Sequence, residues 1–242
     1  MVSRRRQEEL AGLFNCPEDQ IKVVYNGVDP VELLGLSPES WELILRLGLI
    51  DSEINLLMPV RVTQAKNIEY ALHTLAVLKS EGKSPKLVLT GPPDPHDPES
   101  MQYYQSLLDL RELLNLEKEF RFVFESGPDP QQPFLIDTRT VGELFRVSDI
   151  LFMPSHREGF GMPILEAGLA GLPIMSAHIP ASTEIARADA LIFDLDQDPK
   201  TSAYQIIQIL DNNAISRFRR RVRLGFTWQG IFNRDISPLL EG

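Results

Sequence analysis

The chain is almost free of cysteine, because Cys16 is the only one among its 242 residues. A single thiol cannot form a disulfide within the chain, and it provides no zinc-finger spacing. The four histidines add no metal-ligand pattern, so the sequence predicts no metal site. This cysteine usage is typical of a reducing, cytoplasmic location.

Long hydrophobic runs and an excess of basic residues are also missing. No apolar run approaches the ~20 residues that span a bilayer, and the first residues lead into Gln-Glu-Glu instead of the apolar segment of a signal peptide. Lys and Arg number 24 against 34 Asp and Glu, which gives a net charge of −10. A nucleic-acid partner needs a basic surface, so the charge argues against that class of function.

What the sequence does contain is an alternation of short apolar runs with amphipathic stretches. The predicted strands are residues 21–25, 56–60, 86–90, 121–124, 150–154, 173–176 and 191–193. Several of these runs are apolar without alternation, as expected for strands covered on both faces. Helical patterns lie between them, at residues 68–78, 103–114, 137–146 and 164–170. The alternation predicts an α/β fold with a doubly wound, Rossmann-like parallel sheet.

The two ends of the chain do not fit this alternation. Residues 8–14 form a predicted helix with no strand before it, and residues 199–210, 214–223 and 227–239 form predicted helices after the last strand. We therefore divide the chain into an N-terminal helix with its linker (1–20), a sheet domain (21–225) and a terminal helix (226–242).

In a doubly wound sheet, ligands bind in the loops after the carboxyl ends of the strands. The loop after the predicted strand 150–154 contains Glu158, Gly159 and Gly161, and a helix then begins near Pro163. Glycines let backbone amides approach a ligand, and a helix start favours an anion. Glu166, inside that helix, is placed to accept hydrogen bonds from vicinal hydroxyls, as the acidic residue does for ribose in dinucleotide folds. A glycine turn with two surface glutamates explains the residue types equally well.

Three further segments lie at strand ends. Arg61 and Lys66 follow the predicted strand 56–60, where two cations can hold a diphosphate, although such a pair taken alone is more often solvated surface charge. A glycine, Gly91, ends the predicted strand 86–90, and Asn26-Gly-Val-Asp29 is by itself a turn signal.

Together these segments resemble the retaining glycosyltransferases of the GT-B fold, family 4, the group that is similar to glycogen and sucrose synthases. The motifs that carry the resemblance are Asn26-Gly-Val-Asp29, Arg61 with Lys66, Gly91, Ser155, Glu158-Gly-Phe-Gly161, Pro163, and Glu166 eight residues after Glu158. They extend over nearly the whole chain. Two positions depart from the family pattern: Val60 replaces a glycine, and residues 179–183 replace a glycine pair before Glu184.

The resemblance implies a site for a nucleotide diphosphate sugar as substrate, with no further cofactor and no metal. Arg61 and Lys66 would hold the diphosphate, and Glu158 would lie at the hydroxyls of the transferred sugar; these three are the expected catalytic residues. The expected donor-binding residues are Gly91, Glu125, Leu144, Gly159, Phe160, Gly161, Leu165 and Glu166. Among them, Glu166 would bind the ribose, and Glu125 and Leu144 would lie near the base.

The resemblance also implies that a domain is missing. Enzymes of this fold have two Rossmann-like domains, of which the first holds most of the acceptor and the second most of the donor. This chain resembles the second, so the expectation is a donor-binding half that is inactive alone and that belongs to an enzyme transferring sugar with retention. The alternative is a non-catalytic nucleotide-sugar-binding subunit or sensor.

Particular residues also bear on two other enzyme classes and on possible partners. A glycosidase using Glu158 and Glu166 as its carboxylate pair is disfavoured because the second lies within a helix, and a dehydrogenase lacks its Gly-x-Gly-x-x-Gly motif. Exposed apolar surface left by the missing domain would favour self-association. The arginine-rich run 217–223 is explained by the helix dipole, while a peripheral contact with an anionic membrane stays open.

Overall fold

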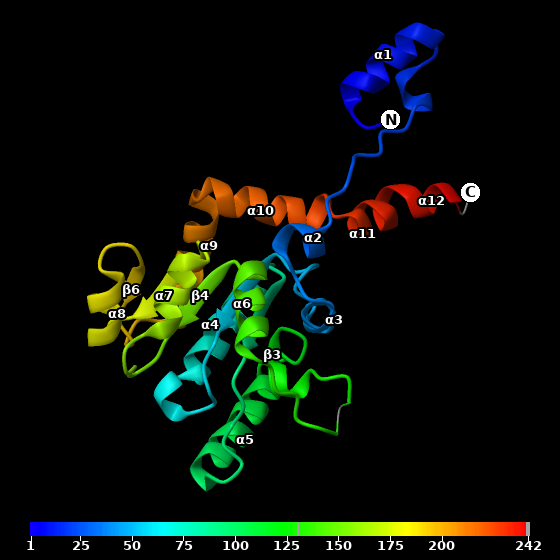
Figure 1. Cartoon of the computed structure of the whole chain (residues 1–242). Helices are drawn as coiled ribbons and strands as arrows, with labels where there is room; N and C mark the ends of the chain where they lie inside the picture. Colours follow the sequence, from blue (N-terminus) through cyan, green and yellow to red (C-terminus); the bar gives the residue numbers. More distant parts are fainter. Residues whose placement is uncertain (130, 241–242) are drawn as a thin grey trace.

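A computed structural model describes residues 1–129 and 131–240, and its centre is a six-stranded parallel sheet (Figure 1). The strands are β1 (Ile54–Met58), β2 (Pro85–Leu89), β3 (Phe120–Phe122), β4 (Ile150–Met153), β5 (Ile174–Ala177) and β6 (Leu191–Phe193). Their order is β3-β2-β1-β4-β5-β6, and all neighbours run parallel. The predicted doubly wound α/β fold is confirmed. The order reverses between β1 and β4, which is the topological switch point where such sheets bind ligands.

The strands are apolar on both faces because helices cover both. Every residue of β1, β4 and β5 is buried. Leu57 of β1, for example, lies opposite Val88 of β2 and Leu151 of β4, and all three belong to the hydrophobic core. Continuous burial of this kind favours apolar runs, which is the main pattern of the sequence. The polar exceptions, Asn55 in β1 and Ser176 in β5, are hydrogen-bonded, as buried polar groups require.

The helices form two groups. One contains α4 (Ile68–Ser80), which packs against α5 (Pro98–Leu113) and α9 (Pro199–Asn212). The other contains α6 (Thr138–Val147), which packs against α3 (Pro38–Leu47) and α7 (Met162–Leu169), and α7 in turn packs against α8 (Pro180–Ala186). The predicted helical stripes match α4, α5, α6 and α7, whereas α3 and α8 were not predicted.

The predicted strand 21–25 is wrong. These residues follow α1 (Arg4–Phe14) and the short 3₁₀ turn Glu18–Gln20, and they run as an extended segment outside the sheet. No strand of the described sheet pairs with them, and β-forming composition alone does not make a strand without a partner to complete its hydrogen bonds. The chain then enters α2 (Pro30–Leu34), which Asp29 caps by accepting a hydrogen bond from the Val31 amide at 2.8 Å.

The Asn26-Gly-Val-Asp29 motif lies against the C-terminal segment. Val28 forms a parallel bridge with Thr227, in which the Val28 amide donates to Phe226 at 2.8 Å and the Trp228 amide donates to Val28 at 3.2 Å. This bridge joins two segments that are about two hundred residues apart at the point where both leave the sheet domain.

The C-terminal region is less regular than predicted. After α10 (Ala214–Gly225), the predicted helix 227–239 consists of α11 (Trp228–Ile231), a π-helical turn (Phe232–Ile236) and α12 (Ser237–Leu240). Figure 1 shows α1 and the α11–α12 segment projecting from the sheet domain. Glu241 and Gly242, at the end of the predicted segment 226–242, lie outside the described residues. Across residues 1–129 and 131–240, no helix has both the length and the apolar character to cross a membrane.

Candidate functional site

The switch point brings together the loops that follow β1 and β4. Arg61 and a 3₁₀ turn ending at Lys66 come from the first loop, and Ser155 and Glu158 come from the second. The two loops are joined by a backbone hydrogen bond from the His156 amide to the Ala65 carbonyl, at 2.9 Å. Residues that are about ninety positions apart in sequence therefore meet at the switch point, where doubly wound sheets have their ligand crevice.

Lys66 and Glu158 form the central contact of this crevice. The Nζ of Lys66 lies 2.6 Å from Oε1 of Glu158, and the two side chains are only 18% and 9% exposed. The hydroxyl of Ser155, which is fully buried, donates to the same carboxylate oxygen at 2.7 Å. Charge-assisted hydrogen bonds of this kind are short and orient both partners. The pair holds one cation and one carboxylate side by side at the mouth of the switch point.

Arg61 comes from the same loop as Lys66 and is exposed, and within the described part of the chain no hydrogen bond or ion pair of its side chain is present. Its backbone position depends on Gly91. The Gly91 amide donates to the Val60 carbonyl at 3.0 Å, and a Cβ on Gly91 would lie 2.6 Å from that oxygen and 2.8 Å from the Arg61 Cα. Any larger residue at position 91 would displace the loop that carries Arg61.

The glycine-containing loop after β4 ends at Gly161. This residue caps α7 with a φ of 92°, a left-handed conformation that glycine adopts without strain, and Pro163 follows in the first turn. The Phe160 and Leu165 side chains are exposed, and no atom lies within 4 Å of the place where a Cβ on Gly159 would stand. The loop therefore presents open backbone and a helix start, which together suit an anion.

Glu166 lies in a separate hollow between α6 and α7. This hollow has a volume of about 300 Å³ and is lined by Thr138, Val141, Gly142, Phe145, Arg146, Glu166, Leu169 and Ala170. Glu166, the predicted ribose ligand, thus shares this hollow with α6, the helix that contains Leu144, which was predicted to lie near the base.

Two of the predicted donor-binding residues are placed differently. The Leu144 side chain is fully buried in the core, because the apolar face of α6 packs inward, so it cannot reach a ligand. Both oxygens of Glu125 are held by α5: the Tyr104 hydroxyl donates to one, and Arg111 lies 2.9 Å from the other. Burial, followed by the hydrogen bond to Glu125, raises the pKa of Tyr104, which keeps this hydroxyl a donor.

One residue that orients the site was missed as a site residue. Ser155 was noted only as a consensus position, yet its buried hydroxyl orients Glu158. Its spacing, three residues before an acidic residue and directly after a buried strand, is the signal that could have indicated this contact. Among the residues that the structure describes, no group of three or more His, Cys, Asp or Glu side chains is arranged to hold a metal ion.

Comparison with known proteins identifies the family. The family model described as Glycosyl transferases group 1 matches residues 40–224, which include the sheet and both loops of the crevice. The chain belongs to the group 1 glycosyltransferases. It is 27% identical over 245 residues to an uncharacterized glycosyltransferase of Methanocaldococcus jannaschii, a match that covers 98% of this chain and 58% of that protein.

Solved structures of other glycosyltransferases share the fold. HepE from Anabaena, crystallised in complex with UDP, superposes with a TM-score of 0.60 at 19% identity, over 99% of this chain and 62% of that one. The C-terminal domain of the group 1 glycosyltransferase LpcC from Francisella tularensis superposes with a TM-score of 0.57 at 16% identity, over 88% of this chain and 95% of that one. At these identities the likeness concerns the fold alone. The chain spans about half the length of the curated relatives it matches.

Proposed function

We propose that this chain is the donor-binding half of a family 4 glycosyltransferase, which transfers sugar from a nucleoside diphosphate sugar to an acceptor with retention of configuration. The observation that carries the proposal is the Lys66–Glu158 pair, 2.6 Å apart at the switch point, with the exposed Arg61 in the same loop as Lys66. The HepE structures contain UDP, and in one case UDP and glucose, which supports a ligand of this class.

The proposed chemistry follows from the charges around the crevice. When the bond to the sugar breaks, negative charge develops on the leaving diphosphate. Arg61 contributes a fork of donors, Lys66 a point charge and the start of α7 a partial positive charge, and all three would stabilise that charge electrostatically. Glu158 would accept hydrogen bonds from the hydroxyls of the transferred sugar. Because Lys66 already pairs with Glu158, a bound diphosphate would have to share this lysine with the carboxylate.

Glu166 would hold the ribose, and its hollow with Gly142 would take the base. We retain Gly91 as a positioning residue for Arg61. Leu144 and the side chain of Glu125 leave the proposed contact set, since one is buried and the other is fully engaged with α5.

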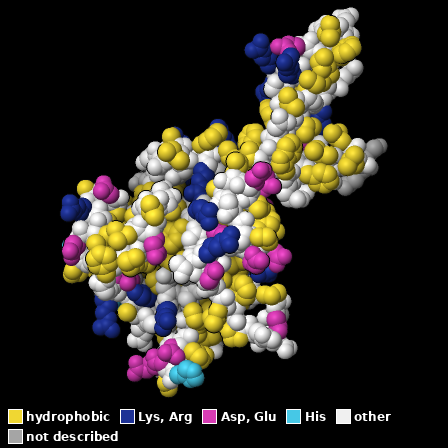
Figure 2. All heavy atoms as spheres, in the orientation of Figure 1, with side chains coloured by type: hydrophobic (Ala, Val, Ile, Leu, Met, Phe, Trp, Pro, Cys, Tyr) yellow, Lys and Arg dark blue, Asp and Glu magenta, His cyan; other side chains and the backbone are white. Residues whose placement is uncertain are grey.

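The acceptor would be held by a further domain outside this chain. Exposed apolar side chains gather on the two projecting segments, as the yellow spheres in Figure 2 show. They include Leu13 and Phe14 of α1 together with Trp228, Phe232 and Leu240 near the C-terminus. A domain packed over these side chains would remove them from water, and without it the same surface would favour self-association. Reducing cytoplasm remains the location that we infer from the single cysteine.

Calorimetric titration of the chain with uridine, guanosine and adenosine diphosphates tests the donor site. Glu166→Ala should weaken binding by ~1–3 kcal/mol, because the ribose hydroxyls lose their acceptor. Glu112→Ala on α5 is the matched control, since Glu112 is an exposed glutamate that does not line the hollow of Glu166 and does not belong to the loops after β1 and β4. Absence of binding at millimolar nucleotide, or equal loss in both variants, would contradict the assignment.

Transfer itself is tested with radiolabelled nucleotide sugars on this chain and on any longer protein that contains it, with the anomeric configuration of the product read by NMR. Retention supports the family 4 mechanism. Nucleotide-sugar binding without turnover in any of these proteins would instead favour the binding-subunit alternative.

A further inference from the structure

Two hydroxyls of α5 hold the loop that follows β1. The Ser100 hydroxyl donates to the Val62 carbonyl at 3.0 Å, and the Tyr103 hydroxyl accepts from the Ile68 amide, also at 3.0 Å. Ser100 and Tyr103 are three positions apart, so they lie on one face of the helix. Both residues are buried, with 4% and 7% of their surface exposed. The loop between these two contacts carries Lys66.

The start of α4 depends on Tyr103. Asn67 occupies the N-cap position in a left-handed conformation, with a φ of 49°, and within the described residues its side chain makes no capping hydrogen bond. The first amides of a helix have no partner inside it, so they need acceptors from elsewhere. Tyr103 is the acceptor for the Ile68 amide, and its hydroxyl also donates to the Glu69 carboxylate. One phenol therefore holds the first two residues of α4.

The surroundings of Tyr103 keep its hydroxyl protonated. Burial, followed by the hydrogen bond to Glu69, raises the pKa of Tyr103. A protonated phenol can donate to Glu69 and accept from the Ile68 amide at the same time. Both contacts are therefore present together around neutral pH.

The same contacts bear on Lys66, which ends the 3₁₀ turn two residues before Ile68. On the other side of Lys66, the Ala65 carbonyl accepts from the His156 amide at 2.9 Å. The backbone of Lys66 is thus held between the loop after β4 and helix α5, and its ammonium lies 2.6 Å from Glu158. Lysine has a long, flexible side chain. Holding its backbone reduces the rotamer freedom that is lost when the ammonium binds an anion.

We propose that Tyr103 is a positioning residue for Lys66. The phenol acts by holding the start of α4, which keeps the Lys66 ammonium beside Glu158 at the switch point. The inference rests on the proposed function for the identity of the ligand, a nucleoside diphosphate. The hydrogen bonds of Tyr103 are present without a ligand, so the inference can also be tested without one.

Calorimetric titration with a nucleoside diphosphate gives the first test. Tyr103→Phe removes the hydroxyl and keeps the ring, and it should weaken binding about fivefold. Two matched controls each remove a hydroxyl that donates to another glutamate. Tyr104→Phe on α5 frees Glu125, and Tyr204→Phe on α9 frees Glu81 at the far end of α4. Both controls should bind as the unsubstituted chain does, and circular dichroism shows that each variant is folded.

A double-mutant cycle tests whether Tyr103 acts through Lys66. In a Lys66→Met chain there is no ammonium left to position, so adding Tyr103→Phe should weaken diphosphate binding by less than about twofold. A fivefold loss in both backgrounds would overturn the proposal, because Tyr103 would then affect binding without Lys66.

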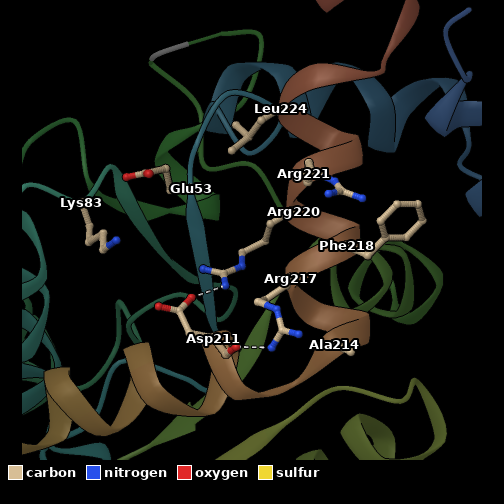
Figure 3. Close-up of a pocket in the computed structure, with 9 residues that line it drawn as sticks. All are labelled: Glu53, Lys83, Asp211, Ala214, Arg217, Phe218, Arg220, Arg221 and Leu224. Atoms are coloured by element: carbon tan, nitrogen blue, oxygen red, sulfur yellow. Dashed lines mark hydrogen bonds and ion pairs between the residues drawn. The ribbon is translucent and has the colours of Figure 1, made fainter. Parts of the chain in front are cut away.

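The arginine-rich helix α10 is a second place where a diphosphate could bind. Its arginines do not form one solvated basic surface, because Arg223 forms a buried ion pair with Asp149 at 2.7 Å. Arg220 pairs with Asp211 at 2.6 Å, and this pair lines a hollow of about 520 Å³ together with Lys83 (Figure 3). Lys83 lies just before β2, so the hollow is at the amino ends of the strands. The crevice of the proposed donor site is at their carboxyl ends.

Lys83→Ala separates these two places, because it removes a cation from the hollow and leaves the crevice unchanged. The loss caused by Tyr103→Phe should be equally large in the Lys83→Ala chain. A loss that disappears in the Lys83→Ala chain would overturn the proposal, since the measured binding would then belong to the hollow.

NMR reads the position of Lys66 without nucleotide. In a chain labelled with carbon-13 at the lysine Cε, the two Hε protons of a held side chain give separate signals, whereas free rotation merges them. The Lys66 signals, assigned with Lys66→Arg, should be separate in the unsubstituted chain and in both controls, and they should approach each other in Tyr103→Phe. An unchanged separation in Tyr103→Phe would overturn the proposal. Absence of diphosphate binding in every variant would contradict the proposed function instead, and the NMR result would still decide the role of Tyr103.

Discussion

Removal of the negative charge of Glu158 should strengthen the binding of a free nucleoside diphosphate, and it should favour a nucleoside diphosphate sugar less. In the structure its carboxylate lies 2.6 Å from the Nζ of Lys66 and is held by the Ser155 hydroxyl. A nucleoside diphosphate that takes Lys66 as a partner therefore brings its own charge close to a carboxylate. Glu158→Gln removes that charge and leaves an oxygen for Ser155, so the loop is expected to keep its shape.

The magnitude follows from Coulomb's law. Two unit charges ~5 Å apart repel by ~3 kcal/mol at an effective dielectric constant of ~20. Salt and the partial exposure of the crevice reduce this to ~1–2 kcal/mol, which corresponds to ~5–30-fold tighter binding of the free diphosphate. A nucleoside diphosphate sugar should gain less or lose affinity, because its sugar hydroxyls lose the carboxylate acceptor.

The effect is measured by calorimetric titration with the same diphosphate of three proteins: the unsubstituted chain, Glu158→Gln and the control Glu112→Gln. The expected result is tighter binding for Glu158→Gln alone, with a gain that decreases as salt increases. Unchanged or weaker diphosphate binding in Glu158→Gln, relative to the control, would refute the inference that Lys66 is shared between Glu158 and the diphosphate.

Three other predictions follow from the structure. Gly91→Ala should lower the free energy of unfolding by ~1–3 kcal/mol, because the added Cβ overlaps the loop that carries Arg61. It should also weaken diphosphate binding, because that loop is displaced. Urea unfolding measures the first effect and calorimetry the second, and unchanged diphosphate affinity would exclude the positioning role of Gly91. Arg223 and Asp149 form a buried ion pair at 2.7 Å. Asp149→Leu should lower the free energy of unfolding by ~3–5 kcal/mol because it leaves Arg223 buried without its partner, and adding Arg223→Met should recover more than half of that loss. If urea unfolding shows the double variant to be no more stable than Asp149→Leu alone, the unpaired charge is not the cause. The isolated chain should form no acceptor-dependent product from radiolabelled nucleotide sugars. The proposed acceptor site lies outside it, and alignment of two substrates can supply ~7–11 kcal/mol of the barrier. Acceptor-dependent transfer by this chain would place the acceptor site within it.

The elements of the sheet domain were predictable because local patterns decide them. The apolar run at β1 and the stripe of Ile68 to Leu78 along α4 each specify an element with few alternatives. Strands and helices in alternation then restrict the topology to a parallel sheet, and the loops at its carboxyl ends predicted the edge at which Lys66 and Glu158 meet. The segment 21–25 had the composition of a strand, but a strand also needs a partner strand beside it, and the composition of a segment does not show whether the fold places one there.

The sequence by itself thus determined the fold class and the end of the sheet at which the chemistry-bearing residues gather. Only the tertiary structure decided which side chains form pairs at that end of the sheet and which are buried away from it. Lys66 and Glu158 are 92 positions apart, and Arg223 and Asp149 are 74 apart. Leu144 and Arg223 each belong to a helix that was predicted correctly, yet the direction in which each side chain points depends on what the rest of the chain places beside it. Periodicity sets the face of a helix, whereas burial and charge pairing across the sheet set what that face meets.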